Sequence, residues 1–239
     1  MQYVGSKNKI AKYILPIMLA KRKPNQWWVE PFVGGANVID KVTGNRLGND
    51  INEYLIALLI AVRDGYVPPT DISREMYYAI KAEPHKYPKE LVGFVGFLCS
   101  FGGKWFGGYA FNNKGTNYAE RGSRCLVKQA KNLKGVVFKT GSYLNLEIPE
   151  NSLIYCDPPY ANTCKYKHDI DHEVFWEWCR TQARKGHTVF VSEYSAPKDF
   201  MCIKEVQYKT ILNKNNPSPR VEKLFKYEYK KFVKLKKRY

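Results

Sequence analysis

The sequence predicts an α/β fold, in which a mostly parallel sheet is flanked by helices and interrupted by a smaller, mostly helical insertion. Three observations predict it. Residues 27–62 alternate between strand-like and helix-like segments, residues 66–135 carry helical and loop-like patterns, and strand-like runs return from residue 136 onward. Alternating strands and helices are typical of a parallel sheet, because each crossover helix packs back onto the sheet.

The first part of the predicted α/β domain, residues 1–65, begins with a helix over residues 8–20, which Pro16 is expected to kink or end. The elements that follow are a strand at 27–31, a glycine turn at 32–36, the start of a helix at 37–42, a strand at 46–50 and a helix at 51–62. This order predicts two parallel strands joined by a crossover.

The second part of the predicted domain, residues 136–239, is richer in strands. Strand-like runs occupy residues 136–141, 152–157, 188–194, 201–208 and 222–229. Residues 171–186 predict an amphipathic helix with Gly186 as its C-cap. The strongly basic residues 226–239 predict an edge strand with a charged tail.

The charge of the chain predicts a polyanionic partner. Lys and Arg number 39 against 22 Asp and Glu, which gives a net charge of +17. Nucleic acid is the first such partner to consider, and an anionic membrane surface is a distant second because no lysine-rich amphipathic helix stands out. No apolar run approaches the roughly 18 residues of a membrane span, and the N-terminus lacks the apolar region of a signal peptide. We therefore expect a cytoplasmic protein that does not interact with membranes.

The cysteines and histidines do not predict a metal site. The chain has 6 cysteines and 4 histidines, and neither set has metal-ligand spacing. The cysteines are expected to be reduced thiols. His168 and His172 lie four residues apart, but they straddle Asp171, which is predicted to be a helix N-cap.

The glycine turn and the acid at the end of the next strand predict a nucleotide-like ligand. Gly34 and Gly35 follow a strand, where a backbone must approach such a ligand closely, and Asp50 is placed to bind both ribose hydroxyls. The alternatives are a tight turn without a ligand and, for Asp50, a helix N-cap. A GxxxxGK[ST] phosphate loop is absent. The pocket therefore suits an adenosine without a polyphosphate tail, and S-adenosylmethionine fits.

The segment SLIYCDPPYANT, residues 152–163, ends a buried strand with an acid, two prolines and an aromatic residue. An amino nitrogen on a purine is a poor nucleophile, because its lone pair is delocalised into the ring. Asp157 would accept one N–H bond of that amino group, and Pro158 and Pro159 would fix the turn so that a neighbouring carbonyl accepts the other. Tyr160 would offer a face for the base to stack on. The alternative is an ordinary strand-terminating turn.

Together these motifs resemble the Dam-type DNA adenine-N6 methyltransferases of bacteria and phages, the alpha group of the D12 class. The resemblance covers residues 1–63 and about 136–230, and the DPPY element is its most specific part. The matching blocks, in the order of the family, are Tyr3–Lys7, Glu30–Gly35, Asn49–Asn52, Asp157–Tyr160 and Arg220–Leu224. The resemblance implies a Rossmann-like S-adenosylmethionine-dependent methyltransferase sheet. It also implies two catalytic parts, 1–65 and 136–239, separated by a target-recognition insertion at 66–135.

The resemblance also implies roles for individual residues. Asp157 would bind the target amino group and border the cofactor, and Tyr160 would stack on the flipped adenine. The catalytic set is Asp157, Pro158, Pro159 and Tyr160; the cofactor set is Tyr3, Lys7, Phe32, Gly34, Gly35, Asp50 and Asp157. One position departs from the family, since Ser142 stands where an acid often contacts the cofactor's adenine amino group.

Residues 99–124 are the predicted DNA-reading segment of the insertion. A target base must leave the helix to reach such a pocket, so a basic, groove-entering surface is expected around it. The predicted contacts are Lys104, Lys114, Arg121 and Arg124 to phosphates or guanine edges, and Asn112 or Asn113 to an adenine edge. Trp105, Phe106 or Tyr109 would wedge into the vacated space, unless these aromatic residues simply pack the loop onto the core.

The sequence therefore predicts a site-specific adenine-N6 methyltransferase that acts on double-stranded DNA, as a monomer or weak dimer, in a bacterial or phage-infected cell. The main rival is N4-cytosine methylation, which more often shows serine at the position of Asp157. Methylation of RNA or of protein glutamine usually shows asparagine there. A decayed methyltransferase that only binds DNA is the alternative from another class. The DNA site is left open, with GATC as the family's commonest target.

Overall fold

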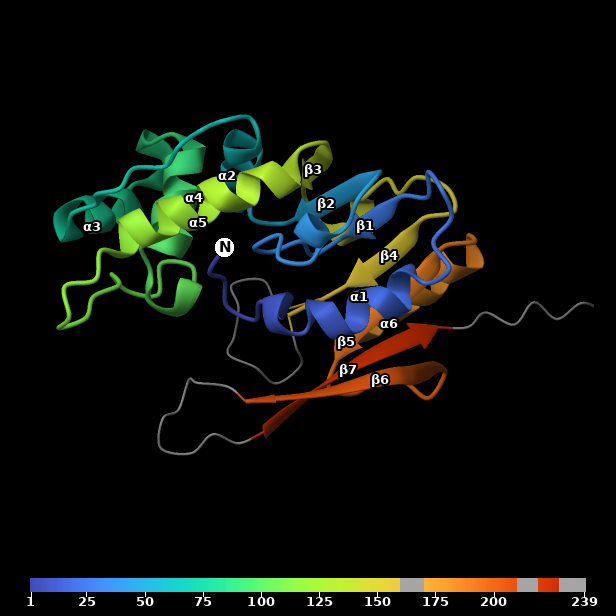
Figure 1. Ribbon diagram of the computed structural model, residues 1–239. Helices are drawn as coiled ribbons and strands as arrows, with labels where there is room; N and C mark the ends of the chain where they lie inside the picture. The colour runs from blue at the N-terminus through green and yellow to red at the C-terminus, as the bar shows by residue number, and fades with distance from the viewer. Residues whose placement is uncertain (160–169, 210–218, 228–239) are drawn as a thin grey trace, which may run out of the picture. The chain divides into compact units, whose positions relative to one another are not determined.

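The computed structural model describes residues 1–159, 170–209 and 219–227. The chain forms two compact units, Met1–Pro149 and Glu150–Tyr239. Both combine strands with helices (Figure 1).

The first unit contains a three-stranded parallel sheet. Its strands are β1 (Trp28–Glu30), β2 (Arg46–Asp50) and β3 (Val136–Thr140), in the order β3-β2-β1. β2 pairs in parallel with β1 and with β3. β1 is buried along its whole length, as is typical of strands in a parallel sheet whose two faces are covered.

Helices make up most of the rest of the first unit. They are α1 (Ala11–Leu19), α2 (Glu53–Arg63), α3 (Arg74–Ala82), α4 (Lys89–Leu98) and α5 (Tyr118–Leu133). α2, α4 and α5 pack against one another, and α2 also contacts β3 (Figure 1). The mostly helical character predicted for residues 66–135 is confirmed by α3, α4 and α5. These helices belong to the same compact unit as residues 1–65.

Two predictions in the first unit are wrong in detail. Residues 37–42 hold only a single 3-10 turn, Ile39–Lys41, in place of the start of a helix. Gly34 and Ala36 both have positive φ, +47° and +54°, and Val42 is already extended, so the chain reverses direction before an α-helix can form. Of the two expectations for Pro16, a kink or an end of the helix, the end is wrong, because α1 continues to Leu19. The proline removes one backbone hydrogen bond, and the helix keeps its buried face, which includes Ile14 and Met18.

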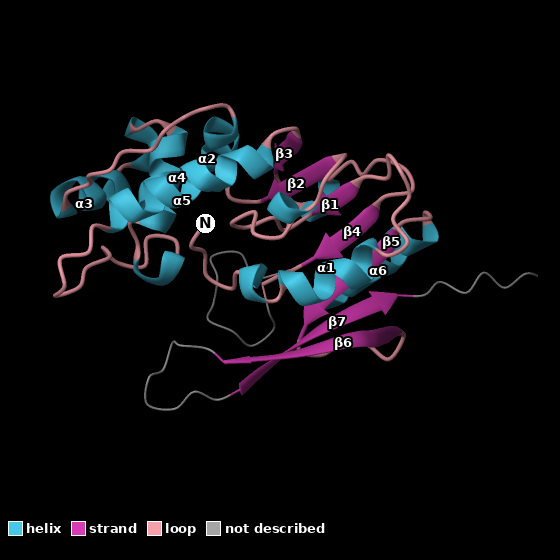
Figure 2. Ribbon diagram, viewed as in Figure 1, coloured by secondary structure: helices cyan, strands magenta, loops and turns pink. Residues whose placement is uncertain are grey.

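The second unit contains a four-stranded mixed sheet. Its strands are β4 (Leu153–Cys156), β5 (Thr188–Glu193), β6 (Phe200–Lys209) and β7 (Pro219–Tyr227), in the order β4-β5-β7-β6. β4 and β5 are parallel, whereas β7 is antiparallel to both of its neighbours (Figure 2). The prediction that residues 226–239 form an edge strand is therefore wrong for residues 226 and 227, the described part of this segment. Lys226 and Tyr227 lie in β7, which is paired on both sides, and β6 is at the edge.

Helix α6 (His172–Arg184) follows the predicted pattern. Asp171 is its N-cap, and one carboxylate oxygen accepts from the backbone N–H groups of Glu173 at 2.9 Å and Val174 at 3.1 Å. Gly186 follows the helix with φ +97°, a conformation that favours glycine. The parallel strands and their helices make this an α/β protein of the Rossmann-like type, as the sequence predicted. Among residues 1–159, 170–209 and 219–227, no helix is long and apolar enough to cross a membrane.

Candidate functional site

The buried side chain of Asn49, near the end of β2, forms hydrogen bonds to the segments that follow β1 and β3. Its Nδ2 donates to the carbonyl oxygen of Pro31 at 3.1 Å and to that of Gly141 at 2.9 Å. The N–H of Gly141 in turn donates to the carbonyl of Asp50 at 3.0 Å. Three strands thus end at one fixed edge, which is where parallel α/β sheets bind their ligands.

The glycine turn after β1 is bonded to Asp50, the last residue of β2. The N–H of Gly34 donates to Asp50 Oδ2 at 3.0 Å, and the N–H of Val33 donates to the carbonyl of Asn49 at 2.7 Å. The glycines also make room for Tyr3. A Cβ added at Gly34 would lie 2.8 Å from Tyr3 Cε1, and one added at Gly35 would lie 2.7 Å from Tyr3 Cβ. The structure brings Tyr3, Gly34, Gly35 and Asp50 together, and their predicted role in binding the cofactor stays a prediction.

Asp50 does not cap helix α2, so that alternative is wrong. The N-cap is Asn52, whose Oδ1 accepts from the N–H of Leu55 at 3.0 Å. Asp50 Oδ1 accepts from the N–H of Asn52 at 3.0 Å. Burial raises the pKa of the Asp50 carboxyl above its ordinary value, while the hydrogen bonds from the backbone of Asn52, Gly34 and Ile51 act in the opposite direction. A carboxylate has about four acceptor positions, so the Asp50 side chain keeps acceptor capacity beyond these backbone bonds.

Two aromatic rings lie at this edge of the sheet. The ring of Phe32 lies 4.9 Å from the ring of Tyr143, at an interplanar angle of 44°. Tyr143 is buried and was missed in the sequence, although an aromatic residue just after a strand end was the available signal. The neighbouring Ser142 caps the 3-10 turn Tyr143–Asn145 by accepting from the N–H of Leu144 at 3.3 Å.

Lys7 is a buried lysine near the start of the chain. It begins the 3-10 turn Lys7–Lys9, which Ser6 caps by accepting from the N–H of Asn8 at 3.3 Å. Lys7 Nζ donates to the carbonyl of Gly5 at 3.1 Å. Its expected contact with the cofactor stays a prediction.

The acid and prolines of the DPPY element lie directly after β4 in the second unit. Cys156, the last residue of β4, is fully buried, Asp157 is half-buried and Pro158 is buried. The strand below them is fixed by a hydrogen bond of 2.8 Å between the hydroxyls of Tyr155 and Ser192 on β5. Tyr160 lies outside the described residues. Asp157 thus stands at the carboxyl end of a parallel strand, as the pattern predicted.

The predicted DNA contacts are mostly exposed. Lys104, Asn113, Lys114, Arg121 and Arg124 all face solvent, and Arg124 is within 3.8 Å of Glu120 on the same helix. Asn112 differs, since its side chain holds the loop before α5. Its Nδ2 donates to Thr116 Oγ1 at 2.8 Å, and its Oδ1 accepts from the N–H of Lys114 at 3.1 Å. Of the two asparagines, Asn113 is therefore the more exposed.

The three aromatic residues expected to wedge into DNA pack within the protein. Trp105 stacks on Tyr54 with ring centroids 5.7 Å apart, and Phe106 meets the ring of Tyr77 at 5.5 Å. The hydroxyl of Tyr109 donates to the carbonyl of Ile72 at 2.8 Å. The exposed aromatic residues of this segment are instead Phe101, with 69% of its surface accessible, and Phe111, with 62%.

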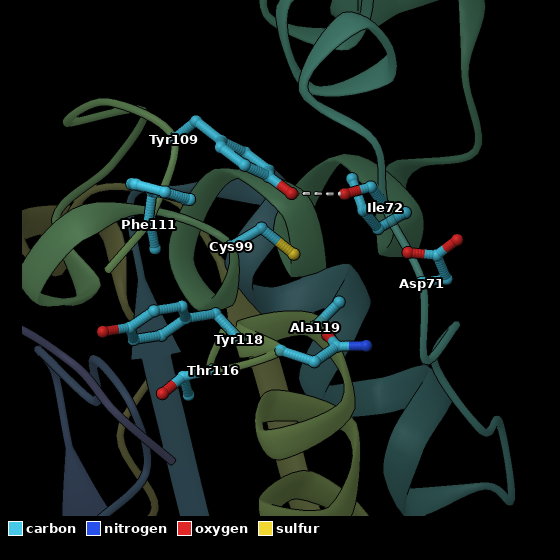
Figure 3. A pocket seen from close by; sticks show the side chains of 10 residues that line it. Asp71, Ile72, Cys99, Tyr109, Phe111, Thr116, Tyr118 and Ala119 are labelled. Carbon is cyan, nitrogen blue, oxygen red and sulfur yellow. Dashed lines mark hydrogen bonds between the residues drawn. The ribbon is translucent and has the colours of Figure 1, made fainter. Parts of the chain in front are cut away.

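A small cavity lies beside the loop that carries Phe111, bordered by the segment before α3, the residue after α4 and the first residues of α5 (Figure 3). Cys99, Tyr109 and Tyr118 line it, and the hydrogen bond from Tyr109 to Ile72 runs along one side. Its volume of about 90 Å³ is well below the roughly 300 Å³ of the smallest typical ligand pockets. None of the predicted cofactor residues lines it. We therefore regard it as a space for water and not as the cofactor site.

No metal centre is seen in the part of the chain that the structure describes, where no group of three or more His, Cys, Asp or Glu side chains is placed to hold an ion. The described cysteines are free thiols: Cys99, Cys125, Cys156, Cys179 and Cys202. Cys164 and His168 lie outside the described residues.

These features define a Rossmann-like α/β protein with a glycine turn and an acid at the ligand-binding edge of its sheet. Residues 3–94 match the model of the D12 class N6 adenine-specific DNA methyltransferases. This match confirms, over those residues, the resemblance drawn from the sequence motifs. It includes the glycine turn, Asp50 and helices α1 to α3.

A curated relative supports the same family. The type II methyltransferase M.FokI of Planomicrobium okeanokoites is 25% identical over 211 residues, which are 77% of this chain and 32% of the relative. The chain thus spans about a third of that relative's length.

Similar solved structures include two described as putative methyltransferases. One is yhhF of Escherichia coli, with a TM-score of 0.40 and 9% identity over 95% of this chain and 90% of that one. The other is SMU.472 complexed with SAH, with a TM-score of 0.39 and 12% identity over 94% of this chain and 53% of that one.

Proposed function

We propose that this protein is a site-specific DNA methyltransferase that transfers a methyl group from S-adenosylmethionine to the N6 amino group of adenine in double-stranded DNA. The observation that carries the proposal is the family match over residues 3–94, which contains the bonded corner of Gly34 and Asp50. The known members of that class act on adenine N6 in DNA, and the fixed strand edge suits their cofactor.

The cofactor residues divide the work of binding. Asp50 keeps acceptor capacity beyond its backbone bonds, which suits hydrogen bonding to a ribose hydroxyl. Gly34 and Gly35 have no side chains, so the backbone of the turn can approach the cofactor closely. Phe32 and Tyr3 supply apolar contact to the cofactor. Lys7 is proposed to contact the cofactor. When bound, the cofactor supplies an electrophilic methyl group on a positively charged sulfur.

Asp157 is proposed to activate the target nitrogen. Its carboxylate accepts one N–H bond of the adenine amino group, and a carbonyl of the Pro158–Pro159 turn accepts the other. Drawing both hydrogens toward acceptors restores the lone pair on N6, which then forms the new N–C bond as the C–S bond breaks and one proton leaves. Tyr160 is proposed to stack on the adenine. This geometry requires the base to leave the DNA helix.

Residues 66–135 are proposed to be the target-recognition insertion between the catalytic parts 1–65 and 136–239. The net charge of +17 and the exposed cations of residues 104–124 suit the phosphate backbone. Base reading is assigned to Asn113, Arg121 and Arg124, with Lys104 and Lys114 on phosphates.

Methylation-aware sequencing tests the proposed reaction. A plasmid free of methylation is incubated with the protein and S-adenosylmethionine, and N6-methyladenine is expected at one recurring short site. Modified cytosine in place of adenine would move the assignment to N4-cytosine methylation. Tight DNA binding without any modification would contradict the enzymatic proposal and support a protein that only binds DNA.

The affinity for DNA is expected to fall steeply with salt. Each phosphate contact made by a lysine contributes about 0.9 to the slope of log K against log salt concentration. Lys104→Ala and Lys114→Ala are each expected to reduce that slope by about one. The matched control is Lys23→Ala, because Lys23 is exposed but precedes the amino end of β1, at the opposite edge from the site. A salt-independent affinity, or an equal change in the control, would contradict the assignment.

A further inference from the structure

The loop of residues 100–109, here called the Phe101 loop, is firmly rooted on the helices of the first unit. Ser100 and Tyr109 form an antiparallel bridge, and the N–H of Phe101 donates to the carbonyl of Gly108 at 2.9 Å. The N–H of Phe106 donates to the carbonyl of Gly96 on α4 at 2.8 Å. The outer side of the loop presents Phe101 and Lys104 to solvent. A rigid root with an exposed aromatic residue and a cation suits contact with DNA.

One residue of this exposed loop, Gly103, is buried. Its carbonyl accepts from the N–H of Val4 at 3.2 Å. A Cβ added at Gly103 would lie 2.9 Å from the backbone nitrogen of Tyr3 and 3.0 Å from the carbonyl carbon of Gln2. Backbone atoms cannot move aside as the end of a flexible side chain can, so the Phe101 loop and residues 2–4 touch with no space between them.

Tyr3 extends this contact to the cofactor corner. Its ring lies 5.3 Å from that of Phe97 on α4, which limits its movement. Its side chain also covers Gly34 and Gly35 at distances that leave no space for a Cβ. Gly34 is bonded in turn to Asp50. A continuous chain of contacts therefore runs from the Phe101 loop through Gly103 and Tyr3 to the glycine turn and Asp50, all within the first unit.

We propose that Gly103 is a positioning residue that couples engagement of DNA by the Phe101 loop to binding of the cofactor at the glycine turn. This inference rests on the proposed function, which supplies both ligands. When the Phe101 loop shifts on binding DNA, it moves Tyr3 against Gly34. When the glycine turn closes on the cofactor, it holds Tyr3 in place, and Tyr3 in turn holds the Phe101 loop. By linkage, each ligand raises the affinity of the other by the same factor.

Adjacent glycines provide a matched pair of variants. Gly102 and Gly103 have nearly the same positive φ, +66° and +69°, a region in which alanine is strained at either position. A Cβ at Gly102 meets nothing within 4 Å, whereas one at Gly103 meets the backbone of Gln2 and Tyr3. Any difference between Gly103→Ala and Gly102→Ala therefore reports the contact with residues 2–3 and not the strain of the loop.

The test measures the dissociation constant of S-adenosylhomocysteine by calorimetry, with and without linear plasmid DNA carrying the methylated site. In the wild type, DNA is expected to lower that constant at least about fivefold, the lower end of usual coupling. Gly102→Ala should keep this ratio, and Gly103→Ala should bring it close to one. A Gly103→Ala ratio equal to the wild-type ratio overturns the inference. So does a wild type that methylates DNA but shows no coupling. A wild type that neither binds S-adenosylhomocysteine nor methylates DNA overturns the proposed function itself.

A measurement on the unmodified protein covers the case in which Gly103→Ala fails to fold. Hydrogen exchange of the Val4 N–H reports its bond to Gly103 directly. DNA binding is expected to slow exchange both in the Phe101 loop and at Val4. Protection of residues 101–109 with unchanged exchange at residues 2–5 would overturn the coupling.

Discussion

Asp157→Ala is expected to lower kcat by at least about 10²-fold, because removing one group aimed at the reacting centre of an enzyme commonly costs 10²–10³ in rate. The affinities for DNA and for S-adenosylhomocysteine should change much less, since the carboxylate acts on the amino group of the target base. A single-turnover assay with tritiated S-adenosylmethionine separates the rate of transfer from binding.

Two further variants make this expectation specific. Asp157→Asn keeps the size of the side chain but places a donor where an acceptor is needed, so it should remain strongly impaired. Glu150→Ala removes an exposed carboxylate that precedes the amino end of β4, and it should leave kcat nearly unchanged. Full activity in Asp157→Ala would remove Asp157 from the mechanism.

Asp50→Ala is expected to weaken binding of S-adenosylmethionine by about 1.5–3 kcal/mol, the usual range for hydrogen bonds to a charged group. That range corresponds to roughly a 10- to 150-fold higher Kd. The variant also loses the bond from the N–H of Gly34, so the glycine turn loosens at the same time. Asp64→Ala is the matched control, because Asp64 forms an exposed ion pair with Arg63 after α2. An unchanged Kd in calorimetry would contradict the role of Asp50.

The raised pKa of Asp50 predicts a pH dependence of cofactor binding in the wild-type protein. The ionised carboxylate offers acceptors to both ribose hydroxyls, so affinity for the cofactor should rise as the pH increases through a pKa above the ordinary 3.8. The effect on the folded protein has the opposite sign. A carboxyl whose pKa is raised by folding stabilises the fold below the pKa of the unfolded chain, and this contribution is lost as the pH rises through the folded pKa. In Asp50→Asn this part of the pH dependence of cofactor binding should be absent.

Much of the site could be predicted from the sequence because its signals are local. The apolar run that becomes β4 is bounded by turns, so its end can be located from the sequence alone. Asp157 follows this run and Asp50 ends the short strand β2, and the carboxyl ends of parallel strands are where ligands bind. Asp171 and Gly186 mark the ends of α6 by cap chemistry that depends only on neighbouring residues.

Other features depend on residues far apart in the chain and were predicted wrongly or missed. The pattern of Trp105, Phe106 and Tyr109 does not reveal that Tyr54, Tyr77 and Ile72 lie against them, so their exposure could not be judged. The position of β7 between β5 and β6 is likewise decided by which strands pair, and strand order is not written in the hydrophobic pattern of any one strand.

The sequence by itself determined the α/β class, most of the elements, and the acids and glycines that mark the candidate site, because hydrophobic period, turn chemistry and caps act over a few residues. Only the tertiary structure decided that Gly34 and Gly35 make room for Tyr3, that Asn49 fastens three strand ends, and that Gly103 touches Gln2 and Tyr3. These contacts join segments up to about a hundred residues apart. They form because the interior of the unit is closely packed, so each backbone segment is held in one position by its neighbours.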